Sequence, residues 1–448
     1  MSRSRKKAKQ REPETAEIDG ISHDGKGIAA VEGKKVFVAG ALQGETVMFQ
    51  RRKRHRNYDE AELLEVIEAS PLRIEPRCAA FGNCGGCSLQ HLSPDDQRAI
   101  KAGTLRDNLE RIGQVVPDEW LDPVFNPGAE GSWNYRRRAR LGVKDVPAKG
   151  RVLVGFREAH APYVCDMHRC EVLAQPVDGL LDALSELIGQ LSIRARLPQI
   201  EVAVADNATT LLFRVLDPPT DADTSLLRQF GVTHNVQIAL QTGGLGTASP
   251  LDDSTYQALR YSLPEFEVEI EFRATDFVQV NAPVNRLMVA KAIELLQVSN
   301  TDRILDLYCG IGNFSLPLAR RAAAVLALEV EQLQVDRGRF NATHNKIENC
   351  EFRTADLSLV DGNDRWIKED WDKVLLDPAR SGAEAIVANM ARIGPERIVY
   401  VSCHPGTLAR DAGVLVREQG YRLSAAGIID MFPHTGHVES IAVFEKVS

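Results

Sequence analysis

The sequence lacks long apolar runs. No stretch approaches the roughly 20 consecutive apolar residues that span a bilayer, and the N-terminus MSRSRKKAKQR has no apolar core of the kind found in secretion signals. These absences predict a cytoplasmic protein that does not associate with membranes. They also bear on the eight cysteines, which are then expected to bind metal or to catalyse rather than to form a disulfide framework.

The sequence also lacks an excess of basic residues, since its formal net charge is -8. That value alone does not favour an anionic partner, but basic residues gather at 1–11, in RRKRHR at 51–56 and in YRRRAR at 135–140. Any single run could be a solvated face. Three runs in an acidic protein predict local patches that bind phosphate, with an attraction that falls as salt rises.

The remaining sequence divides into a tail and three regions. Residues 1–14 are charged and predict a basic disordered tail. Residues 15–74 alternate short apolar stretches with glycine-bearing turns, which predicts a small β-barrel. Residues 75–275 mix helix and strand signals and predict a central α+β domain, with a helix over 93–113. Apolar strands and helix-like segments alternate in 276–448, which predicts an α/β domain with a ligand at the carboxyl ends of parallel strands.

The stretch ILDLYCGIGNFSLPLA predicts a nucleoside site. Its strand runs into a loop where Gly310 and Gly312 allow a tight turn, and the next strand ends at Glu329, which is suited to bind ribose hydroxyls. The third glycine of a dinucleotide-binding loop is missing, because the chain continues as N-F-S. The pattern D-x-x-x-G-x-G, which starts at Asp306, therefore favours S-adenosylmethionine over a nicotinamide dinucleotide.

Reactive side chains stand at three more strand ends. Asp377 in LLDPAR is suited to bind a planar substrate or the cofactor, although Asp-Pro also occurs in simple turns. Cys403 in VYVSCHPG has polar neighbours and a Pro-Gly exit, which favour a nucleophilic thiolate over a small buried hydrophobe. Glu439 begins the last strand and is suited to act as a base. His434 and His437 precede it without a third ligand, which argues against a metal there.

A loop of small residues, CAAFGNCGGC, carries Cys78, Cys84 and Cys87. A metal site normally needs a fourth ligand, and the neighbouring sequence supplies none. Two distant candidates are Cys165 and Cys170. Four thiolates suit either zinc or an iron–sulfur cluster, and the spacing alone does not choose between them.

Taken together, DFVQVN at 276–281, DLYCGIGNF, LLDPAR, SCHP and FPHTGHVES resemble the RNA uracil C5-methyltransferases. With the cysteine loop and the N-terminal barrel added, the resemblance is to the enzymes of this family that act on 23S rRNA. It covers essentially the whole chain after the basic tail. It implies a Rossmann-like class I methyltransferase domain, a TRAM-like RNA-binding barrel, S-adenosyl-L-methionine as the methyl donor, a [4Fe-4S] cluster and 23S rRNA as the partner, with no obligate protein partner.

The resemblance also implies roles for individual residues. Cys403 would add to carbon 6 of uracil and so activate carbon 5 for methylation, and Glu439 would then remove the carbon 5 proton. The cofactor positions would be Gln279, Tyr308, Asn313, Glu329, Asp356 and Asp377. The cluster ligands would be Cys78, Cys84, Cys87 and Cys170, the last followed by E-V-L as in the family, and Cys165 would be spare unless the two exchange.

Two positions depart from the family pattern. His404 stands where the family usually has asparagine, which leaves the hydrogen bonding beside the nucleophile open, and Tyr308 replaces a common phenylalanine.

Other classes of protein explain less of the sequence. A nicotinamide oxidoreductase would leave Cys403, Glu439 and the cysteine loop without a role, and a non-catalytic RNA-binding protein would not need a nucleoside site. A tRNA uracil methyltransferase typically lacks the cysteine loop and the barrel, and an enzyme for another 23S rRNA uridine lacks the barrel.

Overall fold

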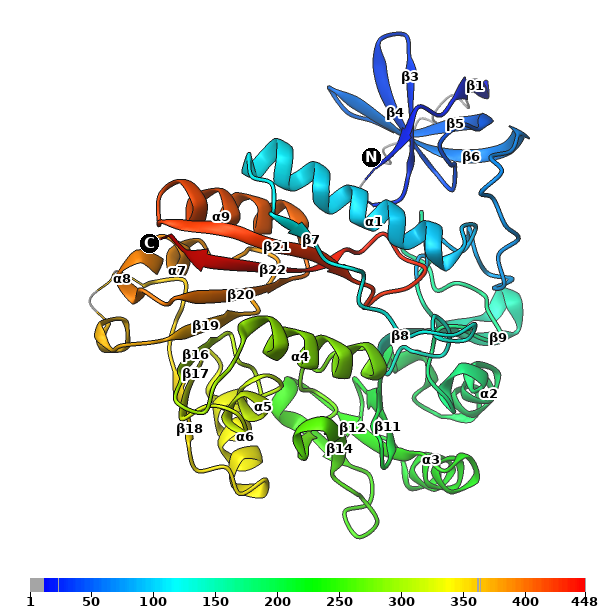
Figure 1. The fold of residues 1–448 in the computed structure, drawn as a ribbon. Coiled ribbons are helices and arrows are strands. Elements are labelled where there is room, and N and C mark those ends of the chain that lie inside the picture. Colours follow the sequence, from blue (N-terminus) through cyan, green and yellow to red (C-terminus); the bar gives the residue numbers. More distant parts are fainter. Residues whose placement is uncertain (1–11, 23, 361, 363, 448) are drawn as a thin grey trace, which may run out of the picture.

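The structure is a computed structural model that describes residues 12–22, 24–360, 362 and 364–447. Residues 1–11 of the predicted tail lie outside this set. The described residues form four sheets, and the N-terminal sheet stands apart from the body of the molecule, with α1 (Pro94–Asn108) running between them (Figure 1). Among the described helices, none is both long enough and apolar enough to cross a membrane.

The N-terminal sheet has the strand order β1-β5-β6-β4-β3-β2. Burial alternates along the central strands, so that Val36, Val38, Val47 and Phe49 face a small core of their own. This confirms the predicted β-rich region. The strands are β1 (Glu14–Glu17), β2 (Gly20–Ile21), β3 (Gly27–Val31), β4 (Lys34–Ala39), β5 (Thr46–Arg54) and β6 (Tyr58–Glu68).

The predicted helix after the cysteine loop is α1. The Ser93 side chain caps it by accepting a hydrogen bond from the backbone of Asp96, and Pro94 occupies the first turn, where a missing N–H costs nothing. A wider helical turn, Leu109–Gly113, extends the helix to the predicted glycine. The helix packs on β21 and α9 of the C-terminal region.

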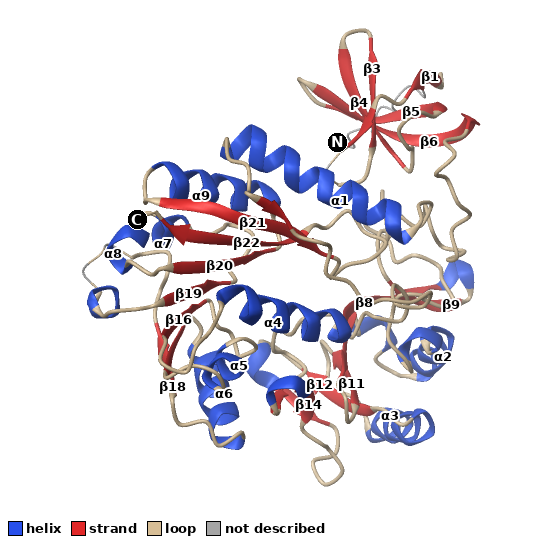
Figure 2. Ribbon diagram, viewed as in Figure 1, coloured by secondary structure: helices blue, strands red, loops and turns tan. Residues whose placement is uncertain are grey.

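The middle region contains a mixed sheet of order β13-β12-β11-β10-β8-β9, with α2 (Leu181–Gln190) and α3 (Asp221–His234) beside it (Figure 2). Only β11 and β12 pair in parallel among its described strands. The bounds are β8 (Arg138–Val146), β9 (Arg151–Gly155), β10 (Gln199–Val204), β11 (Thr209–Arg214), β12 (Gln237–Gln241) and β13 (Ala248–Pro250).

The C-terminal region forms an eight-stranded sheet of order β18-β17-β16-β19-β20-β22-β21-β7. The predicted strands are confirmed as β16 (Arg303–Leu307), β17 (Ala324–Glu329), β19 (Lys373–Leu376) and β20 (Arg397–Ser402), which run parallel with β18 (Cys350–Thr354). The other strands are β21 (Tyr421–Ile429) and β22 (Glu439–Lys446), and the helices are α4 (Ala282–Leu296), α5 (Ser315–Ala319), α6 (Gln332–His344), α7 (Glu384–Val387), α8 (Met390–Ile393) and α9 (Pro405–Arg417).

The last strand of this sheet comes from far upstream. β7 (Glu119–Trp120) pairs in parallel with Ala425 and Ala426 of β21. Both α1 and β7 precede the middle sheet in sequence but pack on the C-terminal sheet, so that sheet is not built from residues after 276 alone.

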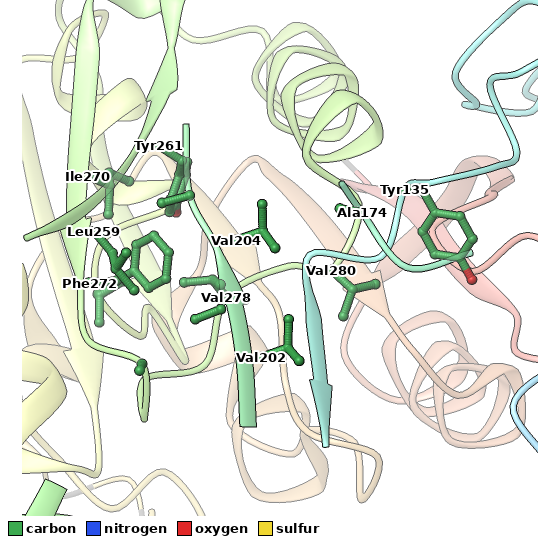
Figure 3. Close-up of a cluster of buried hydrophobic side chains, with 14 of the residues drawn as sticks. Tyr135, Ala174, Val202, Val204, Leu259, Tyr261, Ile270, Phe272, Val278 and Val280 are labelled. Carbon is green, nitrogen blue, oxygen red and sulfur yellow. The ribbon is translucent and has the colours of Figure 1, made fainter. Parts of the chain in front are cut away.

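A continuous apolar core joins the middle and C-terminal regions. Val202 and Val204 of β10 face Val278 and the hairpin of β14 (Leu259–Leu263) and β15 (Val268–Phe272), as Figure 3 shows. The segment that follows β15 therefore crosses from one region to the other with Val278 and Val280 buried, although Phe277 is 70% exposed, and the buried pair fixes the position of Gln279 between them.

Candidate active site

The loop after β16 turns across the carboxyl end of β17. The backbone N–H of Tyr308, at φ 66°, donates to Leu328 O over 2.9 Å, and the N–H of Gly310 donates to Glu329 Oε2 over 3.2 Å. Gly312 has φ 100°, and a Cβ there would lie 3.1 Å from Leu316 and Phe352, so that only glycine fits without a shift. The turn thereby brings Tyr308 and Glu329 together at one edge of the sheet.

Three carboxylates around this loop have different surroundings. Glu329 Oε1 accepts hydrogen bonds from the backbone of Val330 and Glu331. Asp306 is buried beneath the loop and accepts from Ser315, and burial, Asp377 and Glu329 raise its pKa to about 7. Asp356 is exposed, and hydrogen bonds from Ser358 lower its pKa. Glu329 and Asp356 are thus held as acceptors beside the loop.

Gln279 and Asn313 lie around Tyr261 of β14. Tyr261 Oη and Asn285 Nδ2 each donate to Asn313 Oδ1 over 2.9 Å, so that the Asn313 amide is fixed in orientation. Gln279 lines a small cavity with Tyr261, Phe272 and Asn285. Tyr261 and Asn285 connect the two predicted cofactor residues, and no motif in the sequence pointed to either of them.

Cys403 stands between β20 and α9. His404 caps α9, with Nδ1 accepting from the backbone of Thr407, so the thiol follows the strand and precedes the helix directly. A pocket of about 580 Å³ opens at Cys403. This volume is in the range of small-molecule sites. Its walls include Arg380, His404 and His437, together with residues of α1, the cysteine loop and the N-terminal sheet.

Burial and neighbouring acidic groups raise the pKa values around Cys403. Burial, Glu439 and Asp377 raise the pKa of the Cys403 thiol to about 11, whereas Arg380 lowers it. Burial and Asp377 raise the pKa of Glu439 to about 8, and Arg380 again lowers it. Burial raises the pKa of Asp377 to about 7. Arg380 is therefore the cation that favours the charged forms, and it was missed in the sequence although it ends the LLDPAR motif.

A buried network fixes the loop that carries Arg380. Asp411 of α9 is 1% exposed, and its Oδ2 accepts from Tyr400 Oη at 2.7 Å and from the backbone of Ala383 at 2.8 Å. Thr407 Oγ1 donates to the Arg380 carbonyl over 3.2 Å. The loop after Asp377 is thus fastened to the helix that follows Cys403.

Four thiols line a second, smaller cavity, together with Phe81, Phe156 and Met167; they are Cys78, Cys84, Cys87 and Cys170. Backbone N–H groups approach their sulfurs, for example Gly86 to Cys84 Sγ at 3.4 Å. Cys165 is not among the lining residues and instead accepts from Asn83 Nδ2 at 3.4 Å. Within the described ranges, no group of three or more His, Cys, Asp or Glu side chains is arranged around one metal position. The four thiols therefore share a cavity without converging on a single point.

Comparison with known proteins identifies the family. Residues 135–447 match the model of the tRNA (Uracil-5-)-methyltransferase family. The chain belongs to this family.

Two curated relatives match this uracil methyltransferase chain over nearly its full length. The 23S rRNA (uracil(1939)-C(5))-methyltransferase RlmD of Nitrosococcus oceani is 49% identical over 444 residues, which cover 99% of this chain and 98% of the relative. The protein of the same name from Stenotrophomonas maltophilia is 46% identical over 449 residues and 100% of both chains. Among solved structures, the Pyrococcus abyssi tRNA (uracil-54, C5)-methyltransferase in complex with S-adenosyl-L-homocysteine aligns with a TM-score of 0.75 at 24% identity, over 96% of this chain and 99% of that one. This likeness shows a shared α/β fold.

In this family member, the basic run at 135–140 lies only partly at the surface, where the Arg140 side chain is 70% exposed. Arg138 donates to the carbonyls of Ala274 and Asp276, and Arg137 pairs with Asp206. Arg138 thereby ties β8 to the start of the C-terminal region, whereas the Arg137 pair lies within the middle region. In the run at 51–56, the Arg51 side chain is 5% exposed and pairs with Glu14 and Asp59, whereas Lys53 and Arg56 are exposed.

His434 has a structural position in this family member. Its ring stacks on Trp133 at 3.8 Å between centroids, and its Nδ1 is 3.1 Å from Gln97 Nε2. Burial lowers its pKa to about 4, which keeps the ring neutral. The ring therefore packs as a neutral aromatic group between the middle region and α1.

Proposed function

We propose that this protein transfers a methyl group from S-adenosyl-L-methionine to carbon 5 of a uracil in 23S rRNA, the base numbered 1939 in the names of its relatives. The observation that carries the proposal is that a thiol and two carboxyls, from three different strand ends, lie close enough to interact electrostatically, with the thiol at a pocket. Beside the effect of burial, Glu439 and Asp377 raise the pKa of Cys403, and Asp377 raises the pKa of Glu439. A cytoplasmic location would agree with such a substrate.

Carbon 5 of uracil is a weak nucleophile, and Cys403 has the position to activate it. Its Sγ would bond to carbon 6, and the electron pair of the carbon 5–carbon 6 double bond would move toward the carbonyl oxygen at carbon 4 as an enolate. Carbon 5 would bond to the methyl carbon that S-adenosyl-L-methionine supplies. The bond between this carbon and the sulfonium sulfur would break, its electron pair would stay on sulfur, and S-adenosyl-L-homocysteine would leave. Arg380 favours the thiolate because it lowers the pKa of Cys403.

Glu439 would complete the reaction as the base. It would take the proton from carbon 5, so that the double bond re-forms and the bond between carbon 6 and Sγ breaks, which releases the thiolate. Both Cys403 and Glu439 act in charged forms that burial disfavours, since their pKa values are raised to about 11 and about 8. Methyl transfer should therefore accelerate as the pH rises from neutral toward 8.

The cofactor site we infer lies at the carboxyl ends of β16, β17 and β19, where open α/β sheets bind ligands. Glu329 would hold the ribose and Asp356 would lie near the adenine, with the remaining contacts from Gln279, Tyr308, Asn313 and Asp377. Asp377 raises the pKa of both Asp306 and Glu439, which supports a place for it between cofactor and substrate.

For the cysteine cavity we infer a [4Fe-4S] cluster with a structural role. The cluster would be held by Cys78, Cys84, Cys87 and Cys170, with Cys165 as a spare thiol. The shared cavity and the backbone N–H groups near the sulfurs support this donor set. Burial raises the pKa of Cys87 to about 12 and also raises that of Cys170, and the Arg136 charge opposes this rise in both thiols. Its role would be structural, because no step of the methyl transfer moves an electron.

The division of labour we infer follows the sequence regions. The TRAM-like barrel at 15–74 would bind RNA, and exposed Lys53 and Arg56 are suited to contact phosphates. Residues 75–275 would carry the cluster and shape the cleft, and residues 276–448 would catalyse. The target base would be turned out of its stack into the pocket.

The test is incubation with methyl-labelled S-adenosyl-L-methionine and either unmodified 23S rRNA or unmodified tRNA. We expect label in 23S rRNA, at the uridine that the relatives' names give, and none in tRNA. Label in tRNA alone would reject the proposed substrate. Label at a different uridine of 23S rRNA would support the proposed reaction but reject the proposed target position.

A further inference from the structure

The N-terminal sheet reaches the catalytic pocket through the turn between β2 and β3. Asp24 of this turn lines the pocket together with Cys403 and Gly436. A Cβ on Gly436 would lie 2.6 Å from the Asp24 carbonyl carbon and 2.7 Å from its oxygen. Such distances are far inside van der Waals contact, so the two backbones touch where no side chain would fit.

The cysteine loop meets the same point. The backbone N–H of Gly436 donates to Ser88 Oγ over 3.0 Å, and the N–H groups of Ser88 and Leu89 donate to His434 O over 2.9 and 3.0 Å. Next to Asp24, a Cβ on Gly25 would lie 2.7 Å from Leu89 Cδ2. The turn thus rests on both the cysteine loop and the segment that leads into Glu439.

That segment has little freedom to yield. The His434 N–H donates to Gln97 Oε1 over 2.7 Å, and the Tyr135 hydroxyl donates to the Pro433 carbonyl over 3.0 Å. The Lys101 ammonium group, which is 2% exposed, donates to Phe432 O and pairs with Asp430. A change in the turn is therefore transmitted to the pocket rather than absorbed by the segment.

We propose that the Asp24–Gly25 turn is a wall of the catalytic pocket, so that the N-terminal sheet controls turnover as well as RNA affinity. The inference rests on the proposed function for its kinetic part. A base held for attack must sit within a fraction of an ångström of the nucleophile, and the pocket must exclude water. A displaced wall therefore lowers kcat, whereas a remote phosphate contact changes mainly KM.

The kinetic test displaces the turn from two sides. Gly436→Ala acts from the catalytic side and Gly25→Ala from the sheet side. Gly33→Ala is the matched control, because Gly33 also has a positive φ, of 77°, but a Cβ there would have no neighbour within 4 Å. At saturating cofactor and a 23S rRNA fragment, we expect kcat to fall about 10- to 100-fold in the two test variants. The control should keep the wild-type kcat.

A second measurement needs no RNA. The rate at which iodoacetamide modifies Cys403, followed by mass spectrometry of its peptide, should rise several-fold in Gly436→Ala and Gly25→Ala but not in Gly33→Ala. The inference is overturned if Gly25→Ala keeps the wild-type labelling rate, or if it raises KM and leaves kcat unchanged. If the labelling rates rise while the wild-type protein methylates no 23S rRNA, the proposed function fails and the wall stands.

Discussion

The molecule has two thiol sites, the single thiol of Cys403 and the group of four in the cysteine cavity, and they place the same type of side chain in different surroundings. Cys403 stands alone at a strand end, faces a pocket of about 580 Å³ and has Asp377, Glu439 and Arg380 as charged neighbours. The cysteine cavity gathers four thiols behind aromatic side chains, and Cys87 lines both sites. The difference teaches that the surroundings of a thiol decide its chemistry. An opening and a nearby cation favour a nucleophile, whereas several thiols that share one cavity favour metal ligands.

The largest expected effect on the comparison of the two thiol sites comes from replacing Cys403. Replacement by alanine removes the only group proposed to attack carbon 6, so methyl transfer should fall by about 10⁴-fold or more. Cofactor binding, measured by calorimetry, should stay unchanged because the thiol is not a proposed contact. Cys350→Ala is the control, since Cys350 lies on β18 away from the pocket lining and should keep near-normal activity. Turnover by Cys403→Ala would move the nucleophile elsewhere.

A substitution at Glu439 tests whether the attack of Cys403 on carbon 6 and the later release of the thiolate depend on different side chains. Glu439→Gln should still form the bond between Sγ and carbon 6 but lack the base, so turnover should fall about 10²- to 10⁴-fold. A covalent RNA–protein adduct should accumulate and appear as a shifted band on a denaturing gel. Glu445→Gln, on the same strand and paired with Arg397, should form no stable adduct. Absence of the adduct in Glu439→Gln would count against the assigned base.

The cysteine cavity is tested by a pair of variants in one segment. Cys170→Ala should lose most of the bound iron and the brown absorbance at roughly 400 nm expected for thiolate-bound iron. Cys165→Ala should retain both, because Cys165 does not line the cavity. Iron analysis of anaerobically purified protein checks the result. If the protein contains stoichiometric zinc, the cavity is a zinc site and not a cluster site. If only Cys165→Ala loses iron, Cys165 and not Cys170 is the fourth ligand.

The smallest expected effect concerns stability. The pKa of Glu439 is raised from 4.5 to about 8, so the folded protein keeps a proton that the unfolded chain loses. This stabilising contribution is complete below pH 4.5 and is lost as the pH rises through 8. Glutamine cannot ionise, so Glu439→Gln should gain Tm relative to wild type by about 2 °C or more between about pH 5 and pH 8.5. Thermal denaturation at the two pH values measures this, and a constant difference would contradict the raised pKa.

Local patterns predicted much of the fold. The parallel strands, the capped helix from Ser93 and the glycine turn at Gly312 depend on short-range features, namely apolar runs, a capping side chain and a positive φ. The candidate site was predictable to the same extent, because strand ends in a parallel sheet meet at one edge. The position of Cys403 follows from that rule, whereas Glu439 begins β22, which runs antiparallel to β20. The roles of both residues stay predictions.

What the sequence could not predict depends on packing between distant segments. Arg380 acts through its distance from Cys403 and Glu439, which no local pattern encodes. In the basic run at 135–140, no local pattern shows that Arg138 donates to a carbonyl more than a hundred residues away. The contact between Asp24 and Gly436 likewise joins the two ends of the chain.

The edge strand β7 gives this enzyme an order of assembly. Glu119 leaves the ribosome long before its partner Ala425. At translation rates of roughly 5–20 residues per second, the delay is about 15 to 60 s. During that time α1 lacks β21 and α9, and β7 lacks β21, while the middle sheet, which follows both in the sequence, can already fold. The C-terminal sheet thus closes only when nearly the whole chain has been made, and a truncated product would lack a competent catalytic pocket.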